Sequence, residues 1–382
     1  MKIICTQENL SRGLSIVSHV SSKSTNLPIL NNVLFTVEKN TIKLSATNLE
    51  IGIHCHIRGK VEKEGMYTVQ AKLLADYINL LPKERVDIEV LEDGNSSYLH
   101  IQCKNYSTKI KGLPASDFPL IPKIEKKRIY KCDLEDLRVS LSQVVFAVSI
   151  NESRPEIGGV FFHFQGDGLT LAATDSFRLS EKRLMSNSVR SAQGKDMKII
   201  VPSRTIQEVF RVLGGYKDQS DIENVDMVEI AISENQILFS VGNIEITSRL
   251  IEGHYPDYKQ IIPKDFVTEV YMKQQEFVKA VKTASLFTRS GIYDVSLECL
   301  PDTKELVVRS GNSQIGENES RISAEVTGKK NSIILNYRYL LDGLQNINSD
   351  EVQFCIIDNT NPCVIQKKDS PDYMNIIMPI KQ

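Results

Sequence analysis

The pattern of apolar and polar residues along the chain repeats three times. In each repeat a short strand-like run passes into a segment with apolar residues at i, i+4 and i+7, the spacing of an amphipathic helix. The matching segments are IICTQENLSRGLSIVSHV, IYKCDLEDLRVSLSQVVFAV and EVYMKQQEFVKAVKTASLF. Leu10 and Leu14 of the first segment recur at a constant offset as Leu137 and Leu141 of the second. An internal repeat of this kind decides the fold before any local feature does.

A second helix is predicted later in each repeat, within residues 67–82, 199–213 and 332–347. The strand before it ends at Val69, Val201 or Leu335, and its first turn carries Lys72, Arg204 or Arg338. Alternating runs such as LPILNNVLFTVEKNTIKLSAT and PEIGGVFFHFQGDGLTLAAT predict hairpins with turns at EKN and QGDG. The sequence therefore predicts an α+β fold of three tandem similar domains, each with two helices packed on antiparallel sheets. Proline-containing junctions place the domains at residues 1–125, 126–252 and 253–382.

Composition adds little to this organisation. The 382 residues are 41% hydrophobic and 25% charged, as in ordinary globular proteins. Lys plus Arg total 46 and Asp plus Glu 48, a net charge of −2 that neither favours nor excludes a nucleic-acid partner. No apolar run approaches membrane-spanning length, and MKIICTQENL lacks the apolar core of a signal peptide. We expect a soluble cytoplasmic protein.

Motifs for common catalytic chemistry are missing from the sequence. It contains no GxxxxGK[ST], GxGxxG after a strand, GxSxG or HExxH. The seven cysteines are scattered without a CxxC pair, and most lie in apolar runs, which predicts buried reduced thiols. His54 and His56 share one face of a strand, but no third ligand is near in sequence. We expect no cofactor and no metal.

The segment LAATDSFRL, residues 171–179, leaves two interpretations open. Asp175 and Ser176 at a strand end are residue types that a hydrolase or transferase uses, although no partner base or second acid can be named. The near-copy LSATNLEI, residues 44–51, favours a structural turn in which Thr and Asx side chains cap the backbone. A repeat scaffold with no catalytic role and no enclosed DNA is a further alternative.

Several motifs in order carry a family resemblance: LPIL after the first helix, LPASDFP, ATDSFRL, GHYPDY and the C-terminal IIMPIKQ. Together they resemble the bacterial DNA polymerase III beta subunit, the replicative sliding clamp, over the whole chain. The resemblance implies a non-enzymatic processivity factor with the DNA clamp fold. Two chains would close head to tail as a homodimeric ring around duplex DNA. Its implied partners are the DNA polymerase III catalytic subunit, the clamp loader, and other polymerases and repair proteins, with no membrane partner.

The resemblance also implies a groove between the second and third domains that binds partner peptides. Phe177 stands where histidine is common in the family, and Gln260 where arginine can occur. The matching residues are Ile157, Thr174, Ser176, Phe177, Arg178, Leu179, Pro256, Gln260, Ile261, Ile376, Met378, Pro379, Ile380 and Lys381. Apolar side chains with a polar rim suit a shared peptide site.

Cations that recur on the predicted helices are candidates to face DNA phosphates without reading sequence. These are Lys72, Arg138, Arg204, Arg211, Lys279, Lys282 and Arg338, and the resemblance adds Lys23, Asn151 and Arg154. Many family members carry an arginine in the first loop, where this chain has Lys23 and Ser24. The resemblance places the dimer interface at Thr108 and Ile110 against Ser285, Leu286 and Phe287, with Lys109 or Lys111 facing Glu317 and Glu319.

Overall fold

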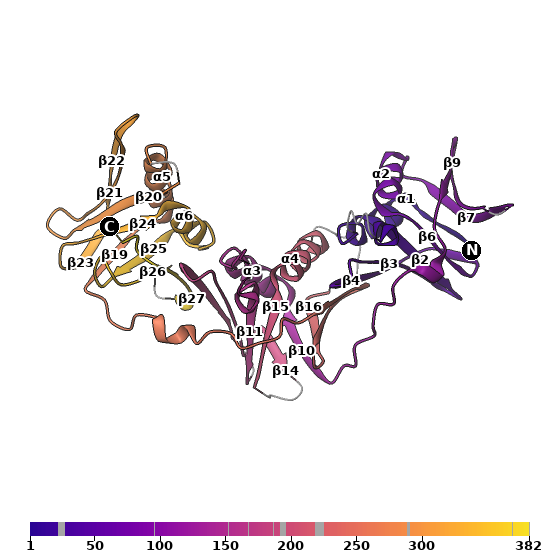
Figure 1. The fold of residues 1–382 in the computed structure, drawn as a ribbon, viewed down its shortest axis with the longest axis horizontal. Coiled ribbons are helices and arrows are strands. Elements are labelled where there is room, and N and C mark those ends of the chain that lie inside the picture. The colour runs from indigo at the N-terminus through magenta and orange to yellow at the C-terminus, as the bar shows by residue number, and fades with distance from the viewer. Residues whose placement is uncertain are drawn as a thin grey trace. The chain divides into compact units, whose positions relative to one another are not determined.

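The computed structural model describes residues 1–21, 27–94, 96–151, 153–166, 168–185, 187–191, 196–217, 225–288, 291–368 and 370–381. All six helices predicted from the sequence are present, which confirms the helical periodicity (Figure 1). They are α1 (Gln7–Val17), α2 (Ala71–Leu80), α3 (Leu134–Val145), α4 (Ser203–Lys217), α5 (Gln274–Ser285) and α6 (Tyr337–Gln345). Short 3-10 helices are η1 (Pro28–Asn31), η2 (Ala115–Asp117), η3 (Pro155–Ile157) and η4 (Tyr258–Ile261).

The remaining elements are strands, and those that pair do so antiparallel. The first third contributes β1 (Lys2–Thr6), β2 (Asn32–Glu38), β3 (Thr41–Thr47), β4 (Ile51–Ile57), β5 (Lys60–Lys63), β6 (Gly65–Gln70), β7 (Arg85–Asp93), β8 (Ser96–Cys103) and β9 (Tyr106–Lys111). The middle third contributes β10 (Arg128–Asp133), β11 (Gly159–Gln165), β12 (Gly168–Thr174), β13 (Arg178–Leu184), β14 (Val189–Ser191), β15 (Met197–Pro202), β16 (Met227–Ile232), β17 (Gln236–Val241) and β18 (Ile244–Arg249). The last third contributes β19 (Thr268–Lys273), β20 (Asp294–Leu300), β21 (Glu305–Asn312), β22 (Gly316–Ser323), β23 (Glu325–Gly328), β24 (Asn331–Asn336), β25 (Glu351–Ile356), β26 (Cys363–Lys367) and β27 (Ser370–Ile377).

The first compact unit comprises Met1–Leu134, Ser191–Gln193 and Glu208–Leu250. One of its sheets has the order β5-β1-β7-β8-β9. The other has the order β14-β10-β16-β17-β18-β4-β3-β2-β6, so strands from the first and middle thirds form one sheet. The joint is the pairing of β18 with β4, in which Ile246 is opposite Ile53. Continuous backbone hydrogen bonding across this joint satisfies edges that would otherwise be exposed.

Helix α1 packs closely on this larger sheet. Its buried face carries Leu10, Leu14 and Val17, and Gly13 lies between them. A Cβ at Gly13 would lie 2.5 Å from a methyl carbon of Ile57 in β4, so the close approach of helix and strand requires glycine. This contact fixes α1 above the end of β4.

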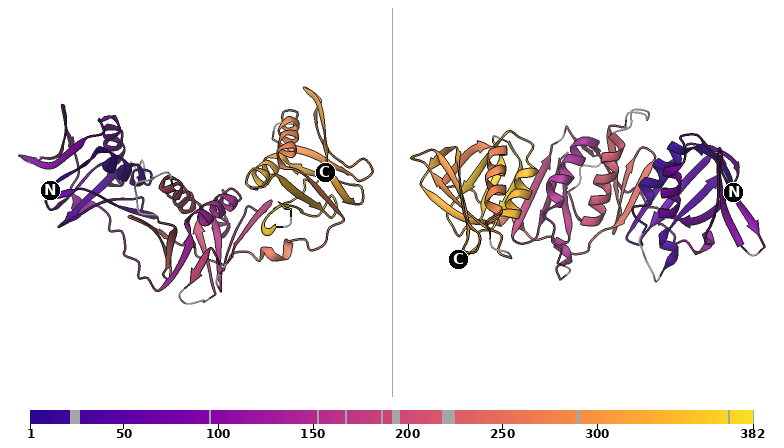
Figure 2. Two further views of the ribbon diagram at one scale, coloured as in Figure 1. Left: turned by 180° about the vertical axis from the view of Figure 1, so that it is seen from behind. Right: turned by 90° about the horizontal axis from the view of Figure 1, so that it is seen from above.

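The second compact unit comprises Glu135–Arg190, Gly194–Gln207 and Ile251–Gln382. Its larger sheet has the order β15-β11-β12-β13-β27-β26-β25-β19-β23, and its smaller sheet the order β22-β21-β20-β24. Strands of the middle and last thirds meet where β13 pairs with β27, with Ser180 opposite Asn375. Helices α5 and α6 lie side by side (Figures 1 and 2) and bury Phe277, Leu340 and Leu344 in the core below them. Both units therefore repeat one construction.

The seven cysteines are free and buried, as predicted. Burial raises the pKa of Cys5, Cys132 and Cys299 to about 12 in each case. These thiols stay protonated at neutral pH and act as small apolar side chains.

His54 is a structural residue of β4. Its Nδ1 lies 2.8 Å from Ser45 Oγ on the neighbouring strand, whereas His56 is exposed. Within the described ranges no group of three or more His, Cys, Asp or Glu side chains is arranged to hold a metal ion. Among those residues, too, no helix has the length and apolar character needed to span a membrane.

The first testable prediction concerns His54 and pH. Burial, with smaller contributions from Lys43 and His56, lowers the pKa of His54 from 6.5 to about 4. The unfolded chain then binds more protons between these values, so stability is complete above pH 6.5 and is lost as pH falls towards 4. Relative to a His54→Asn variant, the wild-type protein should lose about 2 kcal/mol of unfolding free energy between pH 7.5 and pH 5. Urea titrations at both pH values measure this. The exposed neighbour provides the control, because His56→Asn leaves the burial of His54, the main cause of its lowered pKa, in place and should keep most of the pH dependence.

Candidate functional site

The turn between β12 and β13 is built by two side chains that cap the backbone. Asp175 Oδ1 accepts hydrogen bonds from the backbone N–H groups of Phe177 and Arg178, at 2.9 and 3.0 Å. Thr174 Oγ1 accepts from the N–H of Ser176 and donates to the carbonyl of Arg178. Ser176 has φ +79°, a left-handed conformation that is uncommon for a residue other than glycine.

The near-copy in the first repeat forms the same turn. Asn48 Oδ1 accepts from the N–H groups of Glu50 and Ile51, and Thr47 Oγ1 accepts from the N–H of Leu49. Leu49 has φ +78°. The interpretation of Ala-Thr-Asx as a structural turn of the repeat is therefore confirmed.

The second copy differs because Arg178 follows the turn. Its guanidinium donates to Asp175 Oδ2 at 3.0 Å, to Asp342 Oδ2 of α6, and to the carbonyl of Phe146 at 2.8 Å. It also lies over the ring of Tyr339, 4.5 Å from the ring centre. One side chain thus joins β13, the end of α3 and the face of α6.

Three segments of the predicted peptide groove come together around this turn. Leu179 in β13 is opposite Ile376 in β27, and the N–H of Met378 donates to the carbonyl of Phe177 at 2.9 Å. Leu179 and Ile376 belong to one buried cluster with Tyr258, against which Tyr255 and Ile262 pack. The connector between β18 and β19, which carries Pro256, Gln260 and Ile261, therefore lies against the same strands.

The groove residues differ in exposure. Phe177 is 61% exposed and Ile261 46% exposed, so both present apolar surface to a partner. Ile157, Leu179 and Ile376 are almost fully buried and form the support beneath. Pro256, Met378, Pro379 and Ile380 are partly buried, and Ser176, Gln260 and Lys381 are exposed. Ile380 is fixed by a backbone hydrogen bond to Ile334 of β24, at 2.8 Å.

Arg154 lies at this groove. Its Nη1 donates to Ser176 Oγ at 3.1 Å, and its Nε pairs with Glu156 at 3.1 Å. The family resemblance implied a DNA contact for Arg154, and its contact with the turn was not predicted. The parts that Phe146, Tyr339 and Asp342 play around Arg178 were not predicted either. No local sequence signal joins these residues to the turn.

The contacts of Asp175 and Ser176 favour a binding surface over the hydrolase alternative. The Asp175 carboxylate already accepts three hydrogen bonds from the turn and Arg178. Ser176 Oγ accepts from a guanidinium, and within the described ranges no histidine or carboxylate hydrogen-bonds it. A nucleophilic serine needs a base in that position.

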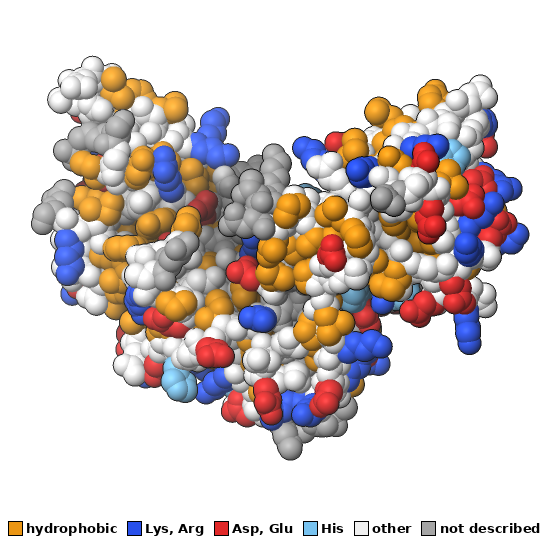
Figure 3. Space-filling view, turned by 45° about the vertical axis from the view of Figure 1, so that its right-hand side comes forward, with side chains coloured by type: hydrophobic (Ala, Val, Ile, Leu, Met, Phe, Trp, Pro, Cys, Tyr) orange, Lys and Arg blue, Asp and Glu red, His pale blue; other side chains and the backbone are white. Residues whose placement is uncertain are grey.

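The predicted DNA-facing cations differ in their exposure and in whether they form ion pairs. Lys72, Arg204, Lys279 and Lys282 are exposed on their helices, and Arg338 is exposed with its guanidinium 3.7 Å from the ring centre of Tyr293. Arg138 pairs with Glu135, and Arg211 pairs with Glu208 and donates to the carbonyls of Ser15 and Ile16 at the end of α1. Asn151 is exposed, and Lys23 falls outside the described residues. On the face in Figure 3, cationic and anionic side chains are interspersed.

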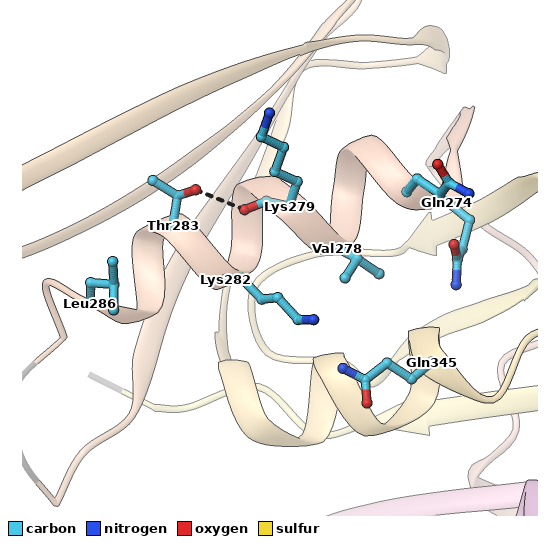
Figure 4. A pocket seen from close by; sticks show the side chains of 8 residues that line it. Gln274, Val278, Lys279, Lys282, Thr283, Leu286 and Gln345 are labelled. Atoms are coloured by element: carbon cyan, nitrogen blue, oxygen red, sulfur yellow. Dashed lines mark hydrogen bonds between the residues drawn. The ribbon is translucent and has the colours of Figure 1, made fainter.

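A shallow groove of about 600 Å³ runs along α5, and Gln345 of α6 also lines it. Figure 4 shows Val278 and Lys282 of α5 on the side of the helix that faces Gln345 of α6, and Lys279 belongs to the lining as well. Thr283 Oγ1 donates to the backbone carbonyl of Lys279 at 2.9 Å. The lining is mostly apolar, with Val278 and Leu286, and the ammonium groups of Lys279 and Lys282 are the cationic groups at it.

The predicted interface residues lie at the outer strands of the two smaller sheets. Thr108 and Ile110 are in β9, the edge of the first unit's smaller sheet. Ser285 ends α5, Leu286 is 72% exposed, and the Phe287 ring lies near Gly316 at the start of β22. Strand β22 is the edge of the second unit's smaller sheet.

Sequence models of the DNA polymerase III beta subunit match nearly the whole chain. The N-terminal domain matches residues 1–122, the central domain 132–257 and the C-terminal domain 259–381. The chain belongs to the DNA polymerase III beta subunit family. This membership confirms the resemblance, the three-domain clamp fold and the sliding-clamp function expected from the sequence.

Individual relatives agree with this assignment. The chain is 28% identical to the beta sliding clamp of Synechocystis sp., covering 100% of this chain and 99% of the relative. It superimposes on the crystal structure of the Bacillus subtilis DNA polymerase sliding clamp with a TM-score of 0.92 at 26% identity, over 100% and 99% of the two chains. A Pseudomonas aeruginosa sliding clamp bound to griselimycin matches with a TM-score of 0.90 at 25% identity, covering both chains completely.

The second testable prediction concerns Arg178. Replacing it with Leu leaves Asp175 and Asp342 without their shared cation and removes the bond to Phe146, so the free energy of unfolding should fall by about 2 kcal/mol. Chemical denaturation at pH 7 measures the change. Arg154→Leu is the matched control, since that half-exposed guanidinium should contribute less than about 1 kcal/mol. Equal losses in the two variants would show that Arg178 is not the joining residue.

Proposed function

We propose that two copies of this chain close head to tail as a ring that encircles duplex DNA and tethers the replicative polymerase. The observation that carries the proposal is the use of strand edges. Within the chain the thirds are joined edge to edge twice, through β4 with β18 and β13 with β27. Strand β9 holds the place of β18 and β27 in the repeat, and β22 holds the place of β4 and β13, and both β9 and β22 lie at an edge of their sheets. A head-to-tail contact that pairs them and whose rotation closes gives a ring.

The pairing of β22 with β9 of the partner chain would be a third joint of this kind, and the equivalence of the repeats predicts its register. Asn318 holds the place in β22 that Ile53 holds in β4 and Ser180 in β13. Thr108 holds the place in β9 that Ile246 holds in β18 and Asn375 in β27. Since Ile53 pairs with Ile246 and Ser180 with Asn375, Asn318 is expected opposite Thr108 of the partner chain. Glu317 then falls opposite Lys109 and Gly316 opposite Ile110.

Side chains at the two edges support this pairing. Glu319 is already paired with Arg309 and Arg321, so Glu317 is the acid better placed to meet Lys109. Leu80 of α2 is 83% exposed, and α2 ends beside Cys103, the residue paired with Tyr106 of β9. Leu286 and Ile315 are exposed at the other edge. These apolar groups should dominate the contact, because surface ion pairs contribute little.

The DNA contacts in this proposal are sequence-independent and weak. Lys72, Arg204, Lys279, Lys282 and Arg338 are the exposed cations on helices that the family resemblance places towards the duplex. Such contacts are lost in salt, so retention on DNA comes from enclosure. Arg138 and Arg211 should contribute less, because glutamates one turn away hold them.

The groove around Phe177 and Ile261 is proposed as the shared docking site for the polymerase III catalytic subunit, the clamp loader, other polymerases and repair proteins. We infer that griselimycin, which binds the Pseudomonas aeruginosa clamp, binds this groove as well. The chain would act without catalysis of its own, in the cytoplasm with the replication machinery. The proposal keeps the domains at residues 1–125, 126–252 and 253–382.

The third testable prediction concerns the register of the β9–β22 joint. Lys109→Cys combined with Glu317→Cys should form a disulfide between chains under mild oxidation, seen as a covalent dimer on a denaturing gel. Native thiols are buried and should not interfere. Lys109→Cys with Asn318→Cys is the control, because a shift of one residue points the side chains to opposite faces of the sheet. More cross-linking in the control would contradict the register.

The fourth testable prediction concerns enclosure. After loading by a bacterial clamp loader, the protein should remain on nicked circular DNA in 0.5 M salt and be lost once the DNA is cut to a linear form. Gel filtration of the labelled protein with the DNA measures retention. Leu286→Asp should abolish retention by opening the joint, whereas Leu120→Asp, at an even more exposed leucine outside β9 and β22, should not. Equal loss from circular and linear DNA would contradict encirclement.

A further inference from the structure

The connector between β18 and β19 forms one wall of the groove but has little regular structure. Its ends are fixed by backbone hydrogen bonds, from Ile251 to Ile200 at 2.9 Å and from Val267 to Ile356 at 3.0 Å. Between them the described structure is irregular apart from the short helix η4. The groove residues Pro256, Gln260 and Ile261 lie in this stretch, so something must hold its middle in place.

A buried glutamate in β13 makes that attachment. The hydroxyl of Tyr258 donates to Glu181 Oε2 at 2.5 Å, and the other carboxylate oxygen pairs with Arg183 at 2.7 Å. Glu181 is 1% exposed and Tyr258 is also buried. Burial, and then the neighbouring carboxylate, raise the pKa of Tyr258, so its hydroxyl remains a donor at any physiological pH. A buried carboxylate that loses one of its hydrogen-bond donors destabilises the folded state. The bond from Tyr258 to this charged group is therefore stronger than a hydrogen bond between neutral groups.

Aromatic packing fixes the residues on both sides of Pro256. Tyr255 stacks on Phe161 of β11 with ring centres 4.9 Å apart, and Tyr258 lies edge-on to both rings at 6.2 and 6.3 Å. The hydroxyl of Tyr258 sets the position of this group along β13, since stacked rings alone slide easily. Gln260 and Ile261 follow Tyr258 within the single turn of η4.

The other repeats do not use this position in the same way. His54 occupies the place of Glu181 in the first repeat and hydrogen-bonds Ser45 in its own sheet. Glu319 occupies it in the third and pairs with Arg309 and Arg321. Among the residues that the structure describes, the second repeat alone uses this place to hold a connector. What is shared among the repeats is structural, and this contact is not shared.

We propose that Glu181 and Tyr258 are positioning residues of the docking groove, which hold the connector so that Ile261 and Gln260 face the bound partner. The inference rests on the proposed docking function of that groove. Neither residue contacts the partner. Their bond sets affinity by ordering one wall before binding, so that less conformational freedom is lost when the partner docks.

The fifth testable prediction is measured with griselimycin as the probe, by titration calorimetry on the full-length protein. Tyr258→Phe deletes one hydroxyl and should weaken binding about 5- to 20-fold. Glu181→Gln keeps an acceptor for the Tyr258 hydroxyl and should bind within about twofold of wild type, whereas Glu181→Met should match Tyr258→Phe. Combining Glu181→Met with Tyr258→Phe should add little further loss, because both remove the same bond.

The matched control is Tyr271→Phe. Tyr271 also donates its hydroxyl to a glutamate, Glu269 at 2.8 Å, in the same unit but on β19, away from the groove. The Tyr271→Phe variant should have a lower free energy of unfolding than the wild type but should bind griselimycin with the same affinity. Hydrogen exchange of the peptide covering residues 252–266 gives a second readout, which should speed up in Tyr258→Phe and stay unchanged in Tyr271→Phe.

The outcomes separate the two levels of the proposal. If wild-type protein binds griselimycin, and Met378→Ala with Pro379→Ala abolishes binding while Tyr258→Phe has no effect, the docking groove stands and the positioning inference is overturned. If hydrogen exchange in the connector becomes faster while the affinity for griselimycin is unchanged, the positioning inference is also overturned. It is overturned as well if Glu181→Gln binds griselimycin as weakly as Glu181→Met. If wild-type protein does not bind griselimycin, the docking proposal falls and the positioning inference with it.

Discussion

The structure depends on the pairing of strands between successive repeats, which gives hydrogen-bonding partners to edges that a single repeat leaves open. The repeat unit cannot cover its own edges, so β4 is paired with β18 and β13 with β27. These two joints explain why the compact units divide the chain through its middle third, although the family domains do not. A sheet continued from one repeat into the next makes each repeat a structural neighbour of the following one.

Function arises where the repeats stop resembling one another. Thr47 with Asn48 and Thr174 with Asp175 build the same turn. Only the second turn is followed by an arginine that reaches α3 and α6, and only there does the next strand carry a buried acid bound to a connector. The groove is thus built on a turn that two repeats share, with contacts of Arg178 and Glu181 that the first repeat lacks. A shared scaffold leaves such sites free to diverge.

Periodic features could be predicted from the sequence, and pairings between distant segments could not. The six helices, the turns and the buried thiols follow from local spacing and composition. The contact of Arg178 with Asp342, and of Glu181 with Tyr258, joins residues far apart in the chain. Arg211 appeared as one more cation on a helix face, yet it caps the end of α1, whose last turn contains no basic residue. Arg154 was likewise assigned to DNA from the loop that contains it, because the sequence does not show that its side chain contacts Ser176.

The shared sheets also determine the order in which the molecule can be completed on the ribosome. Helix α1 emerges early, but its cap at Arg211 and the strand that covers the edge of β4 arrive only with the second half of the middle third. Strand β13 is covered later in synthesis, because its neighbour β27 follows all the other described strands. The nascent protein therefore carries open sheet edges until β27 has left the ribosome, a period in which a chaperone has most to protect.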